Sequence, residues 1–147
     1  MKRFYFFFSI LLVSLFIYTI ISWTPGNSKD GIQFFEGSWQ EALIKAKAEN
    51  KPIFMDIYAT WCGPCKMLKK KTFSDKDAGT YFNANFINLS FNGEAGEGEM
   101  LANKFKITGY PSLIVLNSNG KLIHLQTGYL SANELIAFGK QALGKQQ

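Results

Sequence analysis

The sequence predicts an α/β fold in which a mixed β-sheet is flanked by helices on both faces. The order of the expected elements leads to this prediction. From residue 32 onward, the expected elements follow the order strand, helix, strand, helix, strand, helix, β-hairpin, helix. A parallel βαβ half followed by an antiparallel hairpin gives a mixed sheet that is covered by helices on both sides. We therefore expect one domain over residues 32–147, which is long enough to bury an adequate core.

The first elements are marked by a capping box and by two runs of apolar residues. Residues 32–35 are expected to form an edge strand. Ser38 and Glu41 then have the spacing of a capping box, so we expect a helix from Ser38 to about Asn50. Residues 53–58 are short, largely apolar and rich in β-formers, as in a buried strand.

The middle of the chain alternates helical and strand patterns. Four elements are predicted here: a helix over 62–72, a short helix that ends near residue 82, a turn over 83–85 and a strand over 86–91. Pro64 falls in the first turn of the first helix, where proline is tolerated. These patterns complete the parallel half of the sheet.

The second half is predicted to contain a hairpin between two helices. The expected elements are a connector over 92–98, a short helix over 99–105, a strand over 112–116, a turn over 117–120, a returning strand over 121–126 and a C-terminal helix. The connector holds three Gly and two Glu, so we expect it to be flexible, acidic and solvated. Asn119-Gly120 is a hairpin signal. Ser131 and Glu134 form a second capping box at the start of the last helix.

The two cysteines of the chain, Cys62 and Cys65, are separated by two residues. A Cys-x-x-Cys pair that follows an apolar strand and opens a helix is typical of a dithiol redox site. The free N–H groups at the helix N-terminus stabilise a thiolate at Cys62, and Cys65 can attack the resulting mixed disulfide. A zinc site is the alternative, but it needs about four ligands. A second alternative is a structural disulfide, but such a disulfide does not require the Trp, Gly and Pro that surround the cysteines.

The string Trp-Cys-Gly-Pro-Cys-Lys at residues 61–66 resembles the thioredoxin family, and the resemblance extends over about residues 32–143. It implies the thioredoxin fold and a thiol–disulfide oxidoreductase that uses Cys62 and Cys65 as a redox disulfide. It also implies that Trp61, Gly63 and Pro64 contact the substrate. Neither a cofactor nor a metal is expected.

Asp56 lies six residues before Cys62, in the strand that leads into the motif. Thioredoxins have a buried acid at this position, which implies that Asp56 takes a proton from Cys65 through water. A carboxyl group in an apolar strand has a raised pKa and can exchange protons near neutral pH. The alternative is an aspartate at the exposed end of an edge strand.

Gly109-Tyr110-Pro111 resembles the family's loop that faces the cysteines. The resemblance implies that Pro111 is in the cis form and that the backbone of Tyr110 pairs with an extended substrate peptide by strand addition. The alternative is an ordinary turn proline before a strand. Trp61 is expected to flank the cysteines as an apolar contact surface, and its alternative role is core packing.

One position departs from the family pattern, and one phrase narrows the resemblance. Many thioredoxins pair the buried acid with a lysine in the central strand, and Asn88 aligns with that lysine here. Residues 45–53 are more similar to a bacterial periplasmic branch, which includes the C-terminal domain of a transmembrane disulfide interchange reductase. The resemblance implies protein disulfide substrates. Outside the cytoplasm there is no reducing pool, so we also expect an electron donor, namely a transmembrane reductant.

The N-terminus carries a separate signal. Residues 4–23 form a nearly unbroken apolar run that is long enough, as a helix, to cross a membrane, and residues 1–3 are a basic cytoplasmic stub. The positive-inside rule sends the rest of the chain across, with residues 24–31 as a linker. We expect a single-pass anchor in the cytoplasmic membrane with the domain on the periplasmic or extracellular side. A cleaved signal peptide that releases the domain to the periplasm is the alternative.

The charge balance narrows the function further. The net charge is +5, Lys2 and Arg3 account for two of these charges, and the remaining basic residues are scattered. Nucleic-acid binding is therefore not expected. The Gly-Pro pair between the cysteines favours a reductase with a potential near −270 mV over an oxidase near −120 mV. An oxidase or isomerase, and a docking module without catalysis, are the competing hypotheses.

Overall fold

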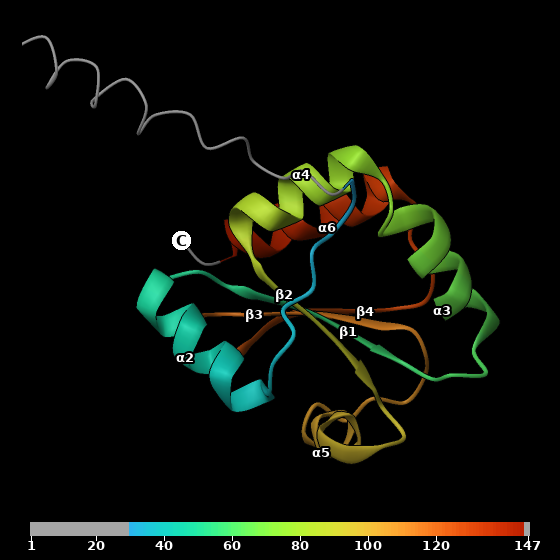
Figure 1. Cartoon of the computed structure of the whole chain (residues 1–147), viewed down its shortest axis with the longest axis horizontal. Helices are drawn as coiled ribbons and strands as arrows, with labels where there is room; N and C mark the ends of the chain where they lie inside the picture. The colour runs from blue at the N-terminus through green and yellow to red at the C-terminus, as the bar shows by residue number, and fades with distance from the viewer. Residues whose placement is uncertain (1–29, 146–147) are drawn as a thin grey trace, which may run out of the picture.

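A computed structural model of the chain describes residues 30–145 and contains a four-stranded mixed sheet in the order β2-β1-β3-β4 (Figure 1). Strand β1 (Ile53–Tyr58) pairs in parallel with β2 (Ile87–Asn92). Strand β3 (Ser112–Leu116) runs antiparallel to β1 and forms the hairpin with β4 (Leu122–Thr127). The predicted mixed sheet and hairpin are confirmed.

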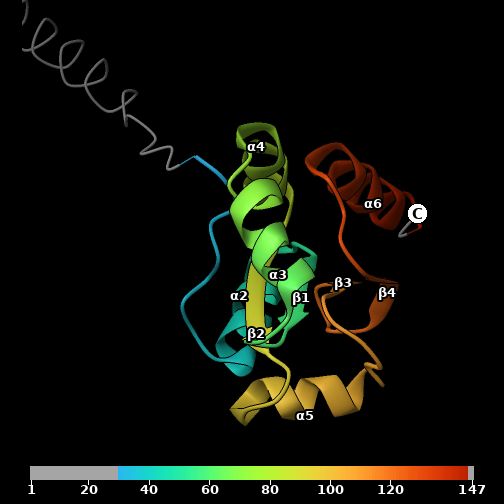
Figure 2. The ribbon, with the colours of Figure 1, turned by 90° about the vertical axis from the view of Figure 1, so that its right-hand side faces the viewer.

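Helices cover both faces of this sheet, as expected (Figures 1 and 2). One face carries α2 (Trp39–Glu49) and α5 (Gly96–Lys104), and the other carries α3 (Gly63–Met67), η1 (Leu68–Thr72), α4 (Lys76–Asn85) and α6 (Ala132–Gly144). The segment η1 is π-helical and continues α3 directly. The sequence predicted one continuous helix over 62–72, and this extent is confirmed. The structure adds that the second half of the helix is π-helical.

Strand β1 divides the core into two clusters because its side chains alternate between the two faces. Met55 and Ile57 pack with α2 and α5, and both are fully buried. Phe54 packs on the other face, with Phe82 of α4 and Leu135 of α6. Asp56 follows Phe54 at a spacing of two, so the sheet places this carboxyl group on the side of the active-site helix.

Both predicted capping boxes are present. Ser38 caps α2 and exchanges hydrogen bonds with Glu41, and Ser131 caps α6 with Glu134 in the same way. These reciprocal bonds satisfy backbone N–H groups that have no partner within the helix. The helix boundaries therefore follow from the local sequence.

Three local predictions are wrong. Residues 32–35 run along β2 and form no strand, because Phe35 N–H donates to the Asn88 carbonyl of β2 while Gln33 N–H donates to the Asn83 side chain. Residues 83–85 do not form a connecting turn, because they are the end of helix α4 (Lys76–Asn85). Helix α5 begins at Gly96, so the predicted connector over 92–98 is partly helical.

The predicted stub at 1–3 and anchor at 4–23 lie outside the described residues, as does most of the linker at 24–31. Within residues 30–145, no helix is both long enough and apolar enough to cross a membrane.

Candidate active site

The segment that leads from β1 into α3 carries both cysteines, Cys62 just before the helix and Cys65 within it. Cys62 is the N-cap of α3, and Pro64 stands in the first turn of the helix, as its fixed backbone geometry allows. The backbone N–H of Cys65 donates to the Sγ of Cys62 at 3.1 Å. The two residues form a disulfide with a Cα–Cα distance of 5.3 Å. The structure is therefore the oxidised form of the dithiol that the sequence predicts.

The disulfide lies just beneath the surface, beside a group of aromatic side chains. Cys62 is 2% and Cys65 7% exposed, and Tyr58 and Tyr110 pack against them. Trp61, by contrast, is 67% exposed, which makes the core-packing alternative wrong for this residue. A large exposed indole next to a reactive disulfide is an apolar surface that a partner can cover.

Trp61 is held in place by two other loops. Its ring meets the ring of Tyr110 edge-on at a centroid distance of 6.2 Å. Its Nε1–H donates to the Glu94 carboxylate at 3.0 and 3.1 Å. A Cβ atom on the buried Gly93 would lie 2.7 Å from the Tyr110 ring, so this loop fits closely against the tyrosine. The loop after β2 thus supports the surface beside the cysteines.

The loop before β3 contains the expected cis peptide bond between Tyr110 and Pro111. Tyr110 packs against the disulfide cluster from this loop, as the resemblance implied. Gly63 and Pro64 are exposed on the other side of Cys62, and a Cβ atom at Gly63 would meet no atom within 4 Å. The predicted contact residues therefore come from two loops, which carry Trp61, Tyr110 and Pro111, and from the first turn of α3, which carries Gly63 and Pro64.

Asp56 is buried in the centre of the sheet, which makes the edge-strand alternative wrong. It pairs with Ser90 of β2 on one side and with Leu113 of β3 on the other, and it is 4% exposed. Ser90 Oγ–H donates to Oδ2 at 2.9 Å, while Oδ1 has no hydrogen-bond partner among residues 30–145. Burial raises the pKa of Asp56 to about 7, against the opposing effects of the Ser90 hydrogen bond and the Lys69 charge.

A cavity of about 460 Å³ connects this carboxyl group with the second cysteine. Asp56 and Ser90 line it from the sheet, Cys65 lines it from α3, and Lys69 lines it from η1. A cavity of this size has room for water between the carboxyl and the Cys65 sulfur, and Asp56, Ser90 and Lys69 provide polar partners for it. Asp56, whose pKa is about 7, therefore faces the same cavity as the sulfur of Cys65.

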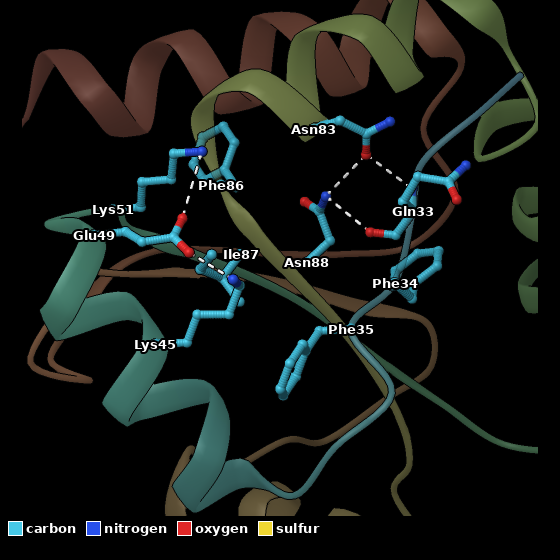
Figure 3. A pocket seen from close by; sticks show the side chains of 10 residues that line it. All are labelled: Gln33, Phe34, Phe35, Lys45, Glu49, Lys51, Asn83, Phe86, Ile87 and Asn88. Carbon is cyan, nitrogen blue, oxygen red and sulfur yellow. Dashed lines mark hydrogen bonds and ion pairs between the residues drawn. The ribbon is translucent and has the colours of Figure 1, made fainter. Parts of the chain in front are cut away.

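Asn88 does not stand beside Asp56, contrary to the expectation from the alignment. Its register partner in β1 is Phe54, two residues before the acid. Figure 3 shows its amide nitrogen directed to the Gln33 carbonyl and to Asn83 Oδ1, both at 3.2 Å. Asn88 therefore belongs to a second, shallower cavity of about 300 Å³ between α2, α4 and the edge of β2, and it takes no part in the cysteine site.

Three residues of the site were not identified from the sequence: Ser90, Lys69 and Glu94. Ser90 and Asn88 share one face of β2, so the periodicity alone could not choose between them. Lys69 follows Cys65 by four residues, and this spacing is a signal that could have indicated it. Nothing in the sequence linked Glu94 to Trp61.

Comparison with known proteins identifies the family. Residues 39–143 match a family model described as a thioredoxin-like domain. The chain belongs to this thioredoxin-like domain family. A thiol:disulfide interchange protein, DsbD, from Yersinia pestis is 31% identical over 100 residues, which cover 66% of this chain and 17% of that protein. The chain thus spans only about a sixth of the length of such relatives.

Solved structures of thioredoxin-like proteins share this fold. One is the solution structure of a protein from Bacteroides thetaiotaomicron, provisionally named a disulphide isomerase. It is 41% identical, covers 79% of this chain and 96% of its own, and superposes with a TM-score of 0.69. The oxidised C-terminal domain of DsbD from Neisseria meningitidis covers 75% of this chain and 99% of its own at a TM-score of 0.62. Its 23% identity supports the fold alone.

Proposed function

We propose that this thioredoxin-like chain is a thiol–disulfide oxidoreductase that reduces protein disulfides outside the cytoplasm. The observation that carries the proposal is the Cys62–Cys65 disulfide at the start of α3, beside a buried carboxyl group whose pKa is about 7. The similarity to thiol:disulfide interchange proteins supports the same chemistry. The site contains the nucleophile, the resolving thiol and a proton acceptor, so no cofactor enters the reaction.

The reduced protein begins the reaction with the Cys62 thiolate. Its sulfur attacks one sulfur of the substrate disulfide, the substrate S–S bond breaks, and a mixed disulfide forms while the other substrate sulfur leaves as a thiolate. Trp61 and Tyr110 offer an apolar surface beside this point of attack. In our proposal the backbone of Tyr110 pairs with an extended peptide by strand addition. The proposed substrate is therefore a disulfide within a protein segment and not a small disulfide alone.

Cys65 completes the reaction. Its thiol gives its proton to the Asp56 carboxylate across the shared cavity, and the resulting thiolate attacks the Cys62 sulfur of the mixed disulfide. The second substrate thiolate leaves, and the Cys62–Cys65 disulfide forms. Two electrons have moved from the dithiol of the protein to the substrate disulfide, so an electron donor must reduce the protein again.

The membrane location belongs to the same proposal. We place residues 4–23 across the cytoplasmic membrane as a single anchor, with the thioredoxin-like domain on the periplasmic or extracellular side. An oxidising compartment has no reducing pool, so a transmembrane reductant would supply the electrons. Alkaline extraction of membranes tests the anchor, because an anchored chain stays with the membrane and a chain with a cleaved signal is released.

The reduction potential of the Cys62–Cys65 pair tests the direction of the reaction. The full chain, held in a mild detergent, is equilibrated with glutathione or dithiothreitol buffers, and the fraction of disulfide is measured. A potential near −270 mV is expected for a reductase. A potential at or above about −180 mV would instead assign the chain to oxidation or isomerisation of disulfides.

Isomerisation is the second candidate because the 41% identical relative carries the provisional name of a disulphide isomerase. The same residues serve both reactions, since an isomerase also uses the Cys62 thiolate for attack. Refolding of scrambled ribonuclease separates the two activities. A docking module without catalysis is a third hypothesis, and Cys62→Ser tests it, because a docking module would keep its cellular role and an enzyme would lose it.

A further inference from the structure

The cavity beside the disulfide brings a buried acid and two lysines to one space. Asp56 and Ser90 lie on its sheet side, and Cys65, Lys66 and Lys69 line it from the active-site helix. The residues that line the cavity include no carboxylate other than Asp56. In the oxidised protein, where Cys65 carries no thiol, Asp56 is therefore the one carboxylate that faces this space.

The Asp56 carboxylate receives little stabilisation from its own sheet. One oxygen accepts the hydrogen bond from Ser90, and the other has no protein partner within residues 30–145. The residue is 4% exposed. A carboxylate at this depth is costly unless an opposite charge or further hydrogen bonds compensate for the lost water. The compensation has to come from the helix side of the cavity.

Lys69 is the residue placed to supply it. It follows Cys65 by four residues, so it extends from the helix on the same side as the cysteine that lines the cavity. Within the described part of the chain, Lys69 forms no salt bridge, so its charge is not taken up by another acid. The next lysine, Lys70, is also exposed on η1 but does not line the cavity.

We propose that Lys69 is a positioning residue whose ammonium group stabilises the Asp56 carboxylate across the cavity and so sets the pH above which Asp56 can accept the proton of Cys65. The proposal rests on the proposed function for the role of that proton. In the step concerned, one proton moves from the Cys65 sulfur to the Asp56 carboxylate and no electrons move. The charged carboxylate is required, so the step slows below the pKa of Asp56.

The electrostatics of the site agree with this assignment. Desolvation raises the pKa of Asp56, and the positive charge of Lys69 lowers it. Lys66 also lines the cavity, from α3, and Tyr58 lines it from β1. Lys69 is the one of the two lysines whose charge lowers the pKa of Asp56. Many thioredoxins have a lysine in the strand where this chain has Asn88. Here the cation near the buried acid is Lys69, which lies on η1.

The test measures the pKa of Asp56 directly and in the oxidised protein, where neither cysteine titrates. The full chain is labelled with ¹³C-aspartate, held in a mild detergent, and its carboxyl resonances are followed by NMR from pH 4 to 9. The resonance of Asp56 is assigned as the one missing from Asp56→Asn. We expect Lys69→Met to raise the midpoint by roughly half a pH unit, because the charge of an exposed lysine is partly screened by solvent and the Lys69 charge is the smallest of the three effects on the pKa of Asp56.

Two further variants control for other causes. Lys70→Met removes the same charge from the same segment outside the cavity, and we expect its midpoint to match that of the unmodified chain. Lys69→Arg keeps the charge and should restore the midpoint. Methionine and arginine are both good helix formers, and residue 69 is exposed, so these variants should fold.

A midpoint in Lys69→Met that equals that of the unmodified chain, or an equal shift in Lys70→Met, overturns the proposal. The rate at which the reduced chain reduces insulin disulfides, followed against pH, supplies the second measurement, and its lower limb should move upward with the midpoint in Lys69→Met. If the limb does not follow the midpoint, the role of Lys69 in the proton step is refuted. If the unmodified chain reduces no insulin at any pH, the proposed function fails, while the NMR result still decides the coupling of the two side chains.

Discussion

Replacing Asp56 by asparagine should remove a pH dependence from the stability of the protein. The folded state raises the pKa of this carboxyl group from 3.8 to about 7. A raised pKa means that the folded state holds the proton more tightly than the unfolded state. The stability from this effect is therefore complete below pH 3.8 and is lost as the pH rises to about 7.

The magnitude follows from the size of the shift. Each pH unit within this window costs roughly 1.4 kcal/mol, because one unit of pKa corresponds to that free energy. Between pH 5 and pH 8.5 the carboxyl group should therefore destabilise the unmodified protein by about 3 kcal/mol. Asparagine has nearly the same shape, stays neutral throughout and can still accept the hydrogen bond from Ser90. The free energy of unfolding of Asp56→Asn, relative to that of the unmodified protein, should therefore be about 3 kcal/mol higher at pH 8.5 than at pH 5.

Urea denaturation of the oxidised full chain at pH 5 and at pH 8.5 measures this difference. Comparison of the two proteins at each pH cancels the contributions of all other titrating groups. It also cancels any constant cost of burying the asparagine amide, because that cost does not depend on pH. If the difference between the two proteins changes by less than about 0.5 kcal/mol from pH 5 to pH 8.5, Asp56 does not titrate in this window.

Three further predictions concern the cysteines, the Trp61 loop and helix α2. Cys65→Ser should accumulate a mixed disulfide between Cys62 and a substrate protein, visible on a non-reducing gel, because the resolving thiol is missing. Glu94→Gln should speed solvent exchange of the Trp61 indole N–H, measured by NMR, by roughly fivefold, since a charge-assisted hydrogen bond becomes a neutral one. Ser38→Ala should lower the free energy of unfolding by about 1 kcal/mol through loss of the helix cap, and an unchanged urea midpoint would contradict it.

The sequence was sufficient for the fold wherever local chemistry determines the structure. Ser38 and Ser131 each have an acid three residues later, and both helices begin where these capping boxes predict. The strand over residues 53–58 has the predicted bounds, because a short apolar run between turn residues has few other stable arrangements. The position of the cysteines at the helix start followed from the same reasoning.

Glycine composition misled the prediction for the connector over 92–98. The three glycines were interpreted as a sign of flexibility, but at two of them, Gly93 and Gly98, neighbouring atoms lie too close for a side chain. A Cβ atom at Gly98 would lie 1.9 Å from the backbone oxygen of Asn92, and one at Gly93 would lie 2.7 Å from the Tyr110 ring. These glycines allow tight packing, and a single sequence does not distinguish that role from mobility.

The partner of Asp56 could not be predicted for a different reason. Side chains of a strand repeat with a period of two, so Asn88 and Ser90 lie on the same face of β2. The choice between them depends on the register of β2 against β1, which opposes Asp56 to Ser90. Register is set by contacts between distant segments, and the pattern of one strand does not contain it.

The site divides into two groups of residues that meet at the disulfide. Trp61, Tyr110 and Glu94 form the surface beside Cys62, and none of them lines the cavity that Asp56 and Lys69 share with Cys65. In the proposed function, recognition of a partner and removal of the Cys65 proton therefore depend on different side chains. Because the two groups have no residue in common, substitutions on the surface should change which disulfides are reduced, and substitutions in the cavity should change the pH at which the mixed disulfide is resolved. The disulfide links the two groups, because Cys62 lies beside the surface group, Cys65 lines the cavity, and an S–S bond joins the two cysteines.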